Sequence, residues 1–276
     1  MPKHLAIIGG GPAGYVAASH AAALGARVSL IDPQPLGGTC LHRGCIPTKT
    51  LVEVCNLLDK MRRAENYGLR LSGTVEADWP AMRAKAGQVI GLLNRGIDGL
   101  MADRQVVHIQ GRGRVIDGHH VEVSGHGVVT ADSVLICTGS SPIRPEQFQI
   151  DGERIATSDD LLNWDSLPRS LLIVGDGVVA CEFAFIMNSL GVAVTLTAMG
   201  ERPLPFLDHD IAGVVQREMR KRGIEFIDRC AVERLAAGPD GIVAYAGGDS
   251  VAVGERALIA VGRRPNSRGL GLELAR

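Results

Sequence analysis

Apolar positions along the chain follow two periods, which together predict a mixture of strands and helices. Runs typical of strands lie at 5–8, 27–31, 133–137, 171–174 and 192–197, with shorter β-patterned pieces at 106–109, 121–124 and 127–130. Helical spacing is found at 13–24, 46–61 and 79–100. The chain therefore opens with a strand, a glycine turn, a helix and a second strand, and a similar unit begins again at residue 171.

The periodicity breaks between residues 145 and 168, which indicates a boundary between two domains of similar topology. Each half also contains a later apolar strand that ends in a glycine with a proline three residues on, at 135–142 and at 258–265. We expect an α/β fold in which residues 1–148 form the first domain and 149–268 the second, with 269–276 beginning a return to the first.

Composition excludes several classes of protein. The 276 residues are 46% hydrophobic and carry a formal charge of −1, which leaves no basic stripe for a nucleic-acid backbone. No apolar run approaches the roughly 20 residues of a membrane span, and the N-terminus has no signal-type cleavage site. The six cysteines show no regular secreted framework. We therefore expect a soluble, unprocessed, cytoplasmic protein that binds neither nucleic acid nor membrane.

The first glycine turn has the spacing Gly9-x-Gly11-x-x-Gly14 between a strand and a helix. Such glycines let the backbone approach a pyrophosphate closely and present a helix N-terminus to its charge. Asp32 ends the next strand, 18 residues after Gly14, where an acid can accept hydrogen bonds from a ribose. The alternative is that the glycines only form a turn and that Asp32 is a loop acid.

A second turn repeats the pattern as Gly175-x-Gly177-x-x-Ala180, so the sequence predicts two dinucleotide sites. Here no acid ends the next strand, where Ala198 stands instead. Because neither an acid nor an evident cation is placed to contact the ribose, we expect weak discrimination between the two cofactors. NADH and NADPH should bind with affinities within roughly tenfold of each other. A purely structural role for this second turn is the alternative.

Cys40 and Cys45 are the only closely spaced cysteines. A tight turn at a helix start can bring them within disulfide range, and a helix N-terminus favours the thiolate, so the pair can store two electrons. The alternatives are a metal site that also uses His42, for which further paired ligands are missing, or two inert thiols. We expect no metal. The remaining cysteines are expected to be small buried residues: Cys55, Cys137, Cys181 and Cys230.

The segment from Gly37 to Lys49 resembles that of the class I pyridine nucleotide-disulfide oxidoreductases, most closely the dihydrolipoamide dehydrogenase branch. It keeps the glycine pair, the threonine, both cysteines and the Pro-Thr-Lys that follows them, and departs only at His42-Arg43. The resemblance covers essentially the whole chain. It implies two Rossmann-like domains of the three-layer ββα type, one for FAD and one for NAD(P).

The resemblance also implies roles for individual residues. Cys45 would lie against the flavin, Cys40 would exchange with substrate, and Lys49 and Glu182 would pair beside the flavin ring. FAD would contact Gly9, Gly11, Pro12, Ala13, Gly14, Asp32, Pro33, Gly38, Thr39, Lys49, Thr138 and Gly139. NAD(P) would contact Gly175, Gly177, Val178, Val179, Glu182, Ala198 and Gly262. Val178 stands where some members of the family have a tyrosine.

The implied reaction passes electrons between NAD(P)H, FAD and the Cys40–Cys45 disulfide, and onward to a lipoamide-type disulfide. Glutathione-like disulfides or mercuric ion are alternative substrates. A small thioredoxin-reductase type would instead need its cysteine pair in the second domain, where only Cys181 and Cys230 stand.

Family members continue through a second flavin-contacting segment and a dimerisation domain, which supplies the catalytic histidine and glutamate. We expect that C-terminal domain to be absent here, a homodimer only for a full-length form, and little disulfide reductase activity from these residues alone. A catalytically incomplete nucleotide-binding module is the alternative.

Overall fold

The chain forms two compact units, described over residues 2–275 in a computed structural model. Unit 1 comprises Met1–Pro47, Ala86–Ser141 and Arg264–Arg276, and unit 2 comprises Thr48–Lys85 and Pro142–Arg263. Neither unit is a continuous stretch of sequence.

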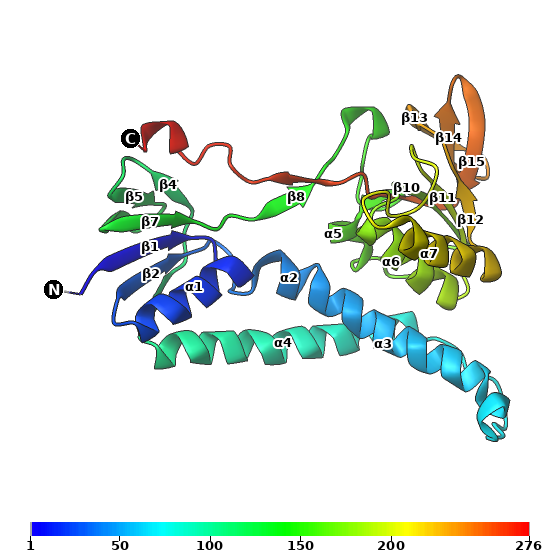
Figure 1. Cartoon of the computed structure of the whole chain (residues 1–276), viewed down its shortest axis with the longest axis horizontal. Helices are drawn as coiled ribbons and strands as arrows, with labels where there is room; N and C mark the ends of the chain where they lie inside the picture. Colours follow the sequence, from blue (N-terminus) through cyan, green and yellow to red (C-terminus); the bar gives the residue numbers. More distant parts are fainter. Residues whose placement is uncertain (1, 276) are drawn as a thin grey trace. The chain divides into compact units, whose positions relative to one another are not determined.

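Unit 1 is built on a four-stranded parallel sheet with the order β3-β2-β1-β7. Its strands are β1 (His4–Ile8), β2 (Arg27–Ile31), β3 (Val107–Ile109) and β7 (Ser133–Ile136). Helix α1 (Pro12–Ala23) and the later part of α4 (Trp79–Asp103) lie on one side of the sheet (Figure 1). A three-stranded antiparallel sheet lies on the other side, formed by β4 (Gly113–Val115), β5 (His120–Val123) and β6 (Gly127–Thr130).

Strand β1 shows why its sequence is apolar throughout. Ile7 packs with Ala18 of α1 on the helical side, whereas Ala6 and Ile8 pack with Val121 of the antiparallel sheet. Successive side chains of a strand point to opposite faces, so a strand covered on both sides is buried at every position. Unit 1 therefore has three layers and two hydrophobic cores.

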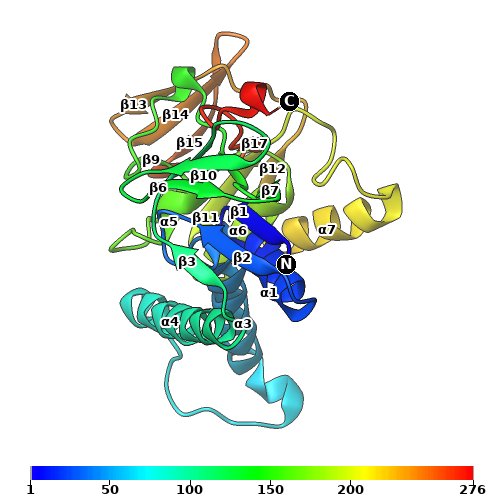
Figure 2. The same ribbon diagram turned by 90° about the vertical axis from the view of Figure 1, so that its left-hand side faces the viewer.

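Unit 2 repeats this plan around a five-stranded parallel sheet with the order β12-β11-β10-β16-β9. These strands are β9 (Ile155–Thr157), β10 (Ser170–Val174), β11 (Ala193–Thr197), β12 (Glu225–Ile227) and β16 (Arg256–Ile259). An antiparallel sheet of β13 (Arg234–Gly238), β14 (Gly241–Ala246) and β15 (Asp249–Gly254) covers one face (Figure 2).

Helices cover the other face of the unit 2 sheet. Those that follow the sheet strands in sequence are α5 (Ser158–Leu161), α6 (Val178–Ser189) and α7 (His209–Lys221). In β10, Leu171 and Ile173 pack into the helical core, which also includes Leu51 of α3 (Cys45–Arg62). Leu172 and Val174 pack against the antiparallel sheet instead.

Several short elements complete the chain. They are α2 (Gly38–His42), β8 (Ser140–Pro142), β17 (Arg263–Pro265) and the 3-10 turns Ala64–Tyr67, Glu146–Phe148 and Leu272–Leu274. Strands β8 and β17 pair with each other where the chain passes between the two units.

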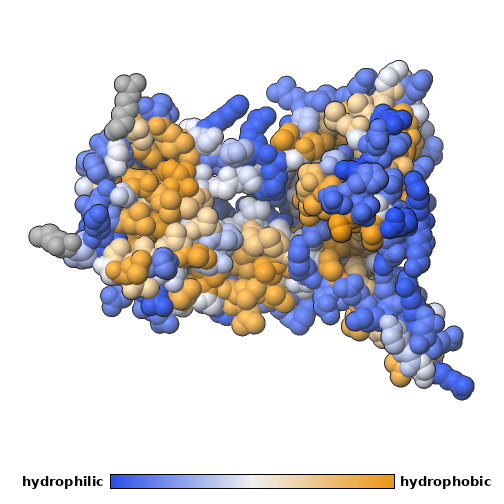
Figure 3. Space-filling model, in the orientation of Figure 1, coloured by the Kyte–Doolittle hydropathy of each residue, from blue (hydrophilic) through white to orange (hydrophobic). Residues whose placement is uncertain are grey.

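The fold class predicted from the sequence is confirmed, and each strand and helix predicted by its residue range lies within a few residues of an observed one. The division at residue 148 stays a prediction, because contacts group the non-contiguous residues 48–85 with unit 2. Among residues 2–275, no helix has the length and apolar character needed to cross a membrane. Leu135 of the edge strand β7 is exposed, and Figure 3 shows apolar side chains gathered on this face of unit 1.

Candidate functional site

The first glycine turn of unit 1 has no room for side chains. Gly9 has a φ of +110°, and a Cβ there would lie 2.2 Å from the carbonyl oxygen of Cys137. A Cβ on Gly14 would lie 1.8 Å from the carbonyl oxygen of Gly9. No side chain of the described residues caps the N-terminus of α1 at Gly11, so its first N–H groups remain available to an anion. The turn therefore fits a pyrophosphate.

Asp32 is tied to this turn by backbone hydrogen bonds. Its Oδ2 accepts from the N–H of Gly10 at 2.5 Å, and its Oδ1 accepts from the N–H of Gln34 at 2.8 Å. Each carboxylate oxygen has a second lone pair, so the residue can also accept from a ribose hydroxyl. A contact between Asp32 and a ribose stays a prediction. A contact between FAD and Pro33, which is exposed, also stays a prediction.

The cysteine segment is anchored directly on the first glycine turn. The N–H of Gly37 donates to the carbonyl of Gly10 at 2.8 Å. Gly38 lies so close to Gly11 that a Cβ on Gly38 would be 2.6 Å from the Gly11 Cα. Only glycine allows this approach, since Gly38 also has a φ of +57°.

The chain folds back between the two cysteines. Cys40 lies within α2, and Cys45 is the first residue of α3. The N–H of Arg43 donates to the carbonyl of Thr39 at 2.9 Å, and a Cβ on Gly44 would lie 3.5 Å from the Cα of Cys40. Cys40 is half-buried and Cys45 exposed, and a disulfide between them stays a prediction.

Two side-chain hydrogen bonds that the sequence did not predict support this segment. The Nε2 of His42 donates to the carbonyl of Leu36 at 2.9 Å, and the Nδ2 of Asn94 donates to the same oxygen at 2.8 Å. Asn94 lies 58 residues from Leu36 in the sequence, and His42 reaches Leu36 only because the chain turns between them. No local sequence pattern therefore indicates either hydrogen bond.

Asn266 fixes the turn after β7. Its Nδ2 donates to the carbonyl of Thr138 at 2.9 Å, and the Thr138 hydroxyl donates to the carbonyl of Asn266 at 2.7 Å. The N–H of Asn266 also donates to the carbonyl of Gly139 at 2.9 Å. The turn that the resemblance places at FAD is thus held by a residue 128 positions away.

Lys49 and Glu182 are brought together within unit 2. The Nζ of Lys49 lies 2.6 Å from Oε1 of Glu182, and their side chains are 60% and 30% exposed. Lys49 lies on α3, four residues after Cys45, so Lys49 and Cys45 lie on one face of that helix. The pairing agrees with the resemblance, whereas its position at a flavin stays a prediction.

A cavity of about 510 Å³ opens at the second glycine turn, at the carboxyl ends of the unit 2 strands. Gly175 has a φ of +133°, and a Cβ there would lie 2.3 Å from the carbonyl of Ala260. A Cβ on Gly177 would meet nothing within 4 Å, and Val178 and Val179 line the cavity beside it. The turn therefore leaves space where a phosphate can approach the backbone.

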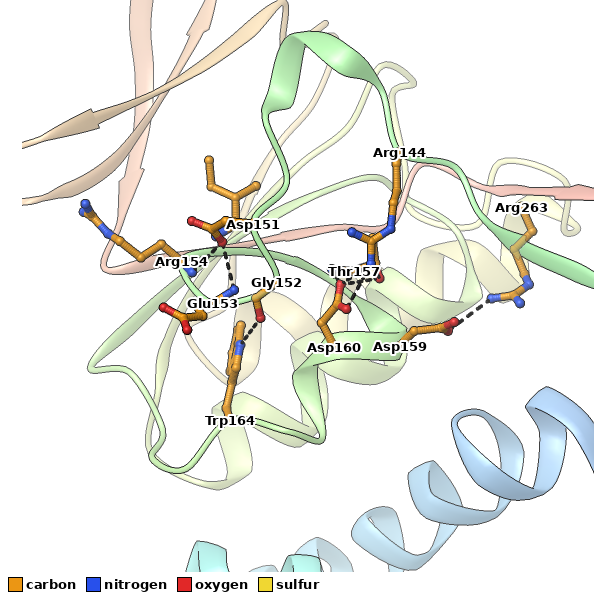
Figure 4. Close-up of polar contacts among 11 residues, drawn as sticks. Arg144, Asp151, Gly152, Glu153, Arg154, Thr157, Asp159, Asp160, Trp164 and Arg263 are labelled. Carbon is orange, nitrogen blue, oxygen red and sulfur yellow. Dashed lines mark hydrogen bonds and ion pairs between the residues drawn. The ribbon is translucent and has the colours of Figure 1, made fainter. Parts of the chain in front are cut away.

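Polar residues form part of the cavity wall, which includes Gly262, Arg263 and Ser158. Arg263 faces Asp159 on this wall (Figure 4), and the Nη1 of Arg263 lies 3.9 Å from the Oδ1 of Asp159. The Oδ1 atom of Asp159 is buried and accepts no hydrogen bond from the described residues.

Next to this wall, Arg144 is held close to the start of α5. Its Nη2 contacts Asp160 at 2.7 Å. Asp160 also accepts from both the N–H and the hydroxyl of Thr157, which places Arg144 against a capping box.

Ala198 lies outside the lining of this cavity. It is 1% exposed and packs in the helical core, whereas its neighbours Thr197 and Met199 line the cavity. Its N–H donates to the carbonyl of Ile227, and its carbonyl accepts from the N–H of Cys230.

The cysteines of unit 2 are not suited to exchange. Burial raises the pKa of Cys181 to about 12 and that of Cys55 to about 11. Burial also raises the pKa of Cys230. Because the thiolate is the reactive form, these residues do not support the thioredoxin-reductase type. Cys137 departs from the sequence expectation, since it is only partly buried.

No group of three or more histidine, cysteine or acidic side chains within residues 2–275 could hold a metal ion.

Comparison with known proteins agrees with this geometry. Residues 3–276 match the pyridine nucleotide-disulphide oxidoreductase family. The chain is 38% identical to a dihydrolipoyl dehydrogenase of Bacillus subtilis, covering 98% of this chain and 60% of that protein. It is 36% identical to a dihydrolipoyl dehydrogenase of Acholeplasma laidlawii, covering 98% of this chain and 82% of that protein.

Solved structures give the same picture. The crystal structure of LpdA from Mycobacterium tuberculosis matches with a TM-score of 0.91 at 31% identity, over 99% of this chain and 61% of that one. The HOCl-induced flavoprotein disulfide reductase RclA from Escherichia coli matches with a TM-score of 0.85 at 29% identity, over 99% of this chain and 59% of that one.

The chain thus spans about 60% of the length of several of these relatives, and the matched family uses FAD and NAD(P). With both glycine turns, the cysteine segment and these matches in agreement, the chain belongs to the pyridine nucleotide-disulphide oxidoreductase family.

Proposed function

We propose that this chain binds FAD along the first glycine turn and a nicotinamide dinucleotide in the unit 2 cavity, and that it passes electrons to and from a Cys40–Cys45 disulfide. The reaction is that of a dihydrolipoamide dehydrogenase-like enzyme. The observation that carries the proposal is the anchoring of the cysteine segment on the first glycine turn, through the Gly37–Gly10 hydrogen bond and the Gly38–Gly11 contact.

The residues of unit 1 fit FAD because the described side chains leave the first N–H groups of α1 uncapped where a pyrophosphate would lie. Gly9, Gly11 and Gly14 would hold the pyrophosphate, Asp32 a ribose, and Thr39 and the Thr138–Gly139 turn the remainder. When bound, FAD would supply the hydride and two-electron chemistry that links the nicotinamide to the disulfide.

The two cysteines divide the exchange between them. The Cys40 thiolate attacks one sulfur of an external disulfide, which forms a mixed disulfide and releases one thiolate. Cys45 then attacks the Cys40 sulfur, which restores the internal disulfide and releases the second thiol. The half-buried Cys40 and the exposed Cys45 at the start of α3 support unequal roles for the pair.

The Lys49–Glu182 pair supplies a fixed charge near this chemistry. By the resemblance, the Lys49 ammonium would stabilise negative charge on a reduced flavin ring, and its 2.6 Å contact with Glu182 supports that placement. Glu182 on α6 limits how far the Lys49 side chain can move.

A lipoamide-type disulfide is the substrate we favour, because the cysteine segment and the relatives named dihydrolipoyl dehydrogenase both support it. Glutathione-like disulfides and mercuric ion are the alternatives. We further propose a cytoplasmic location, since the six cysteines form no regular secreted pattern.

An absorbance spectrum tests the proposal. The purified chain should show bound flavin, and two-electron reduction should add a long-wavelength band from a thiolate beside the ring. Cys45→Ser should abolish that band, whereas Cys40→Ser should leave it, since Cys45 is the thiol next to the flavin.

Cys55→Ser is the matched control, because it removes a thiol in unit 2 that lies outside the cavity lining and whose pKa burial raises to about 11. It should leave the spectrum unchanged. A protein that neither retains nor takes up flavin would support a non-catalytic nucleotide-binding module instead.

A further inference from the structure

The loop that follows β11 closes one side of the unit 2 cavity and is held by two residues in left-handed backbone conformations. Leu204 has a φ of +54°, and its N–H donates to the carbonyl of Asp176 in the glycine turn at 2.7 Å. Arg229 has a φ of +48°, and its N–H donates to the carbonyl of Gly200 at 3.0 Å. Such conformations are unfavourable for residues other than glycine, and they cluster at ligand sites.

These two anchors present an ion pair beside the cavity. The Nη2 of Arg229 lies 2.7 Å from Oε1 of Glu201, and both side chains are 71% exposed. Met199 and Cys230, which line the cavity, lie two residues before Glu201 and one after Arg229. The hydrogen bond and charge of Arg229 lower the pKa of Glu201, so the carboxylate is ionised near neutral pH.

Two other residues near the end of β11, Ala198 and Arg202, are engaged elsewhere. Ala198 is buried in the core. Arg202 donates to the carbonyls of Pro205 and Leu207, at 3.5 and 3.3 Å, within its own loop. Of these residues, Glu201 and Arg229 combine exposure with opposite charges at the end of β11.

We infer that the Glu201–Arg229 pair determines how the site distinguishes NADH from NADPH. The inference rests on the dinucleotide site proposed above. A carboxylate accepts hydrogen bonds from a ribose 2′-hydroxyl and repels a 2′-phosphate, whereas a guanidinium attracts the phosphate. Held together, the two groups offset each other, and the intact pair gives little preference.

Removing one partner should expose the effect of the other. We expect the intact chain to bind NADH and NADPH within about tenfold of each other. Glu201→Gln frees the guanidinium and should shift the ratio of the two dissociation constants toward NADPH by about tenfold. Arg229→Gln should shift the ratio toward NADH by a similar factor. The double variant should return to within about threefold of the parent, because each change acts through the other group.

Matched controls come from a second exposed ion pair at the opposite end of the same sheet. Arg169 directly precedes β10 and Glu255 directly precedes β16, and their side chains lie 3.2 Å apart, outside the cavity lining. Arg169→Gln and Glu255→Gln make the same charge changes and should leave the ratio unchanged. Raising the salt concentration should reduce the gain of Glu201→Gln for NADPH, because the new contact is exposed.

Titration of the flavin-loaded 276-residue chain and its variants with NADH and NADPH separates the possible failures. If the parent binds neither dinucleotide, the proposed function fails and this inference with it. If both dinucleotides bind but the two single variants leave the ratio unmoved, or shift it in the same direction, the inference alone is overturned. Far-ultraviolet circular dichroism of each variant checks that the fold is retained.

Discussion

His4, at the start of β1, is held in one tautomer by its two ring partners. Arg27 is always protonated, so its Nη2 donates to Nδ1 of His4 at 2.8 Å. The proton of the neutral ring is therefore on Nε2, which donates to the hydroxyl of Ser29 at 2.9 Å. Burial and the charge of Arg27 lower the pKa of His4, although the backbone of Thr130 and the charge of Asp132 act in the opposite direction.

This arrangement predicts a loss of stability in mild acid. Because the pKa of His4 is lower in the folded state, the unfolded chain binds a proton first as the pH falls below about 6.5, and the free energy of unfolding decreases. His4→Gln should weaken this pH dependence and lower the free energy of unfolding at neutral pH by about 1–3 kcal/mol. Denaturant titrations between pH 5 and pH 8 measure both effects.

His20→Gln is the control, since His20 is exposed on α1. It should keep the pH dependence of the parent. An unchanged pH dependence in His4→Gln would show that another group causes the acid sensitivity.

A second prediction concerns the Lys49–Glu182 pair, whose side chains are largely or partly exposed. Exposed pairs typically contribute about 0.2–1 kcal/mol, so Lys49→Met and Glu182→Gln should leave the unfolding midpoint nearly unchanged. If the pair lies at the flavin, both variants should alter the spectrum of the reduced, flavin-loaded chain. A large loss of stability with an unaltered spectrum would show that the pair is structural.

At the residue scale, the sequence identifies types of group better than their contacts. The pattern located Asp32, yet hydrogen bonds from Gly10 and Gln34 depend on how the loop folds back. It also placed Ala198 at the ribose, where the structure puts a core side chain. The Glu201–Arg229 contact joins residues 28 apart, so no local period indicates it.

At the scale of elements, the two glycine turns share a pattern, but glycine has a different purpose at the third position of the first turn than at the second position of the second turn. A Cβ on Gly14 would overlap the carbonyl of Gly9, whereas a Cβ on Gly177 would enter open space at the cavity. Glycine is required at position 14 because the helix packs closely against the strand, whereas at position 177 it leaves the space that a ligand needs.

Alanine substitutions should separate these two roles. Gly14→Ala forces the helix away from the turn and should cost about 1–3 kcal/mol of stability. Gly177→Ala should leave stability within about 1 kcal/mol of the parent, yet weaken dinucleotide binding by tenfold or more. Thermal unfolding and nucleotide titration measure the two outcomes, and equal dinucleotide affinity in Gly177→Ala would place the phosphate elsewhere.

Long periodic elements were predictable from the sequence because their side chains repeat against one core. The five-residue helix α2 was expected only as a tight turn, since its start depends on the left-handed backbone of Gly37 rather than on any apolar period. The pairing of β8 with β17 joins segments far apart in sequence, which a single sequence does not reveal.

At the scale of the whole molecule, each unit has its own hydrophobic cores on both faces of its parallel sheet. The clusters around Ile7 and Ile8 belong to unit 1, and those around Ile173 and Leu172 belong to unit 2. A unit with a separate core can unfold as a separate cooperative transition, so a single two-state description is not expected to hold for the chain.

Calorimetry with each cofactor tests this separation. A ligand that binds only the folded form stabilises its own unit by about 2.7 kcal/mol when its concentration is 100 times its dissociation constant. FAD should therefore raise the midpoint of one transition, and NADH that of the other. Gly177→Ala, which narrows the unit 2 cavity, should reduce the shift caused by NADH to about half or less, because a tenfold weaker affinity leaves about 1.4 kcal/mol, and it should preserve the shift caused by FAD. One transition that both cofactors shift together would mean that the two units unfold as one cooperative body despite their separate cores.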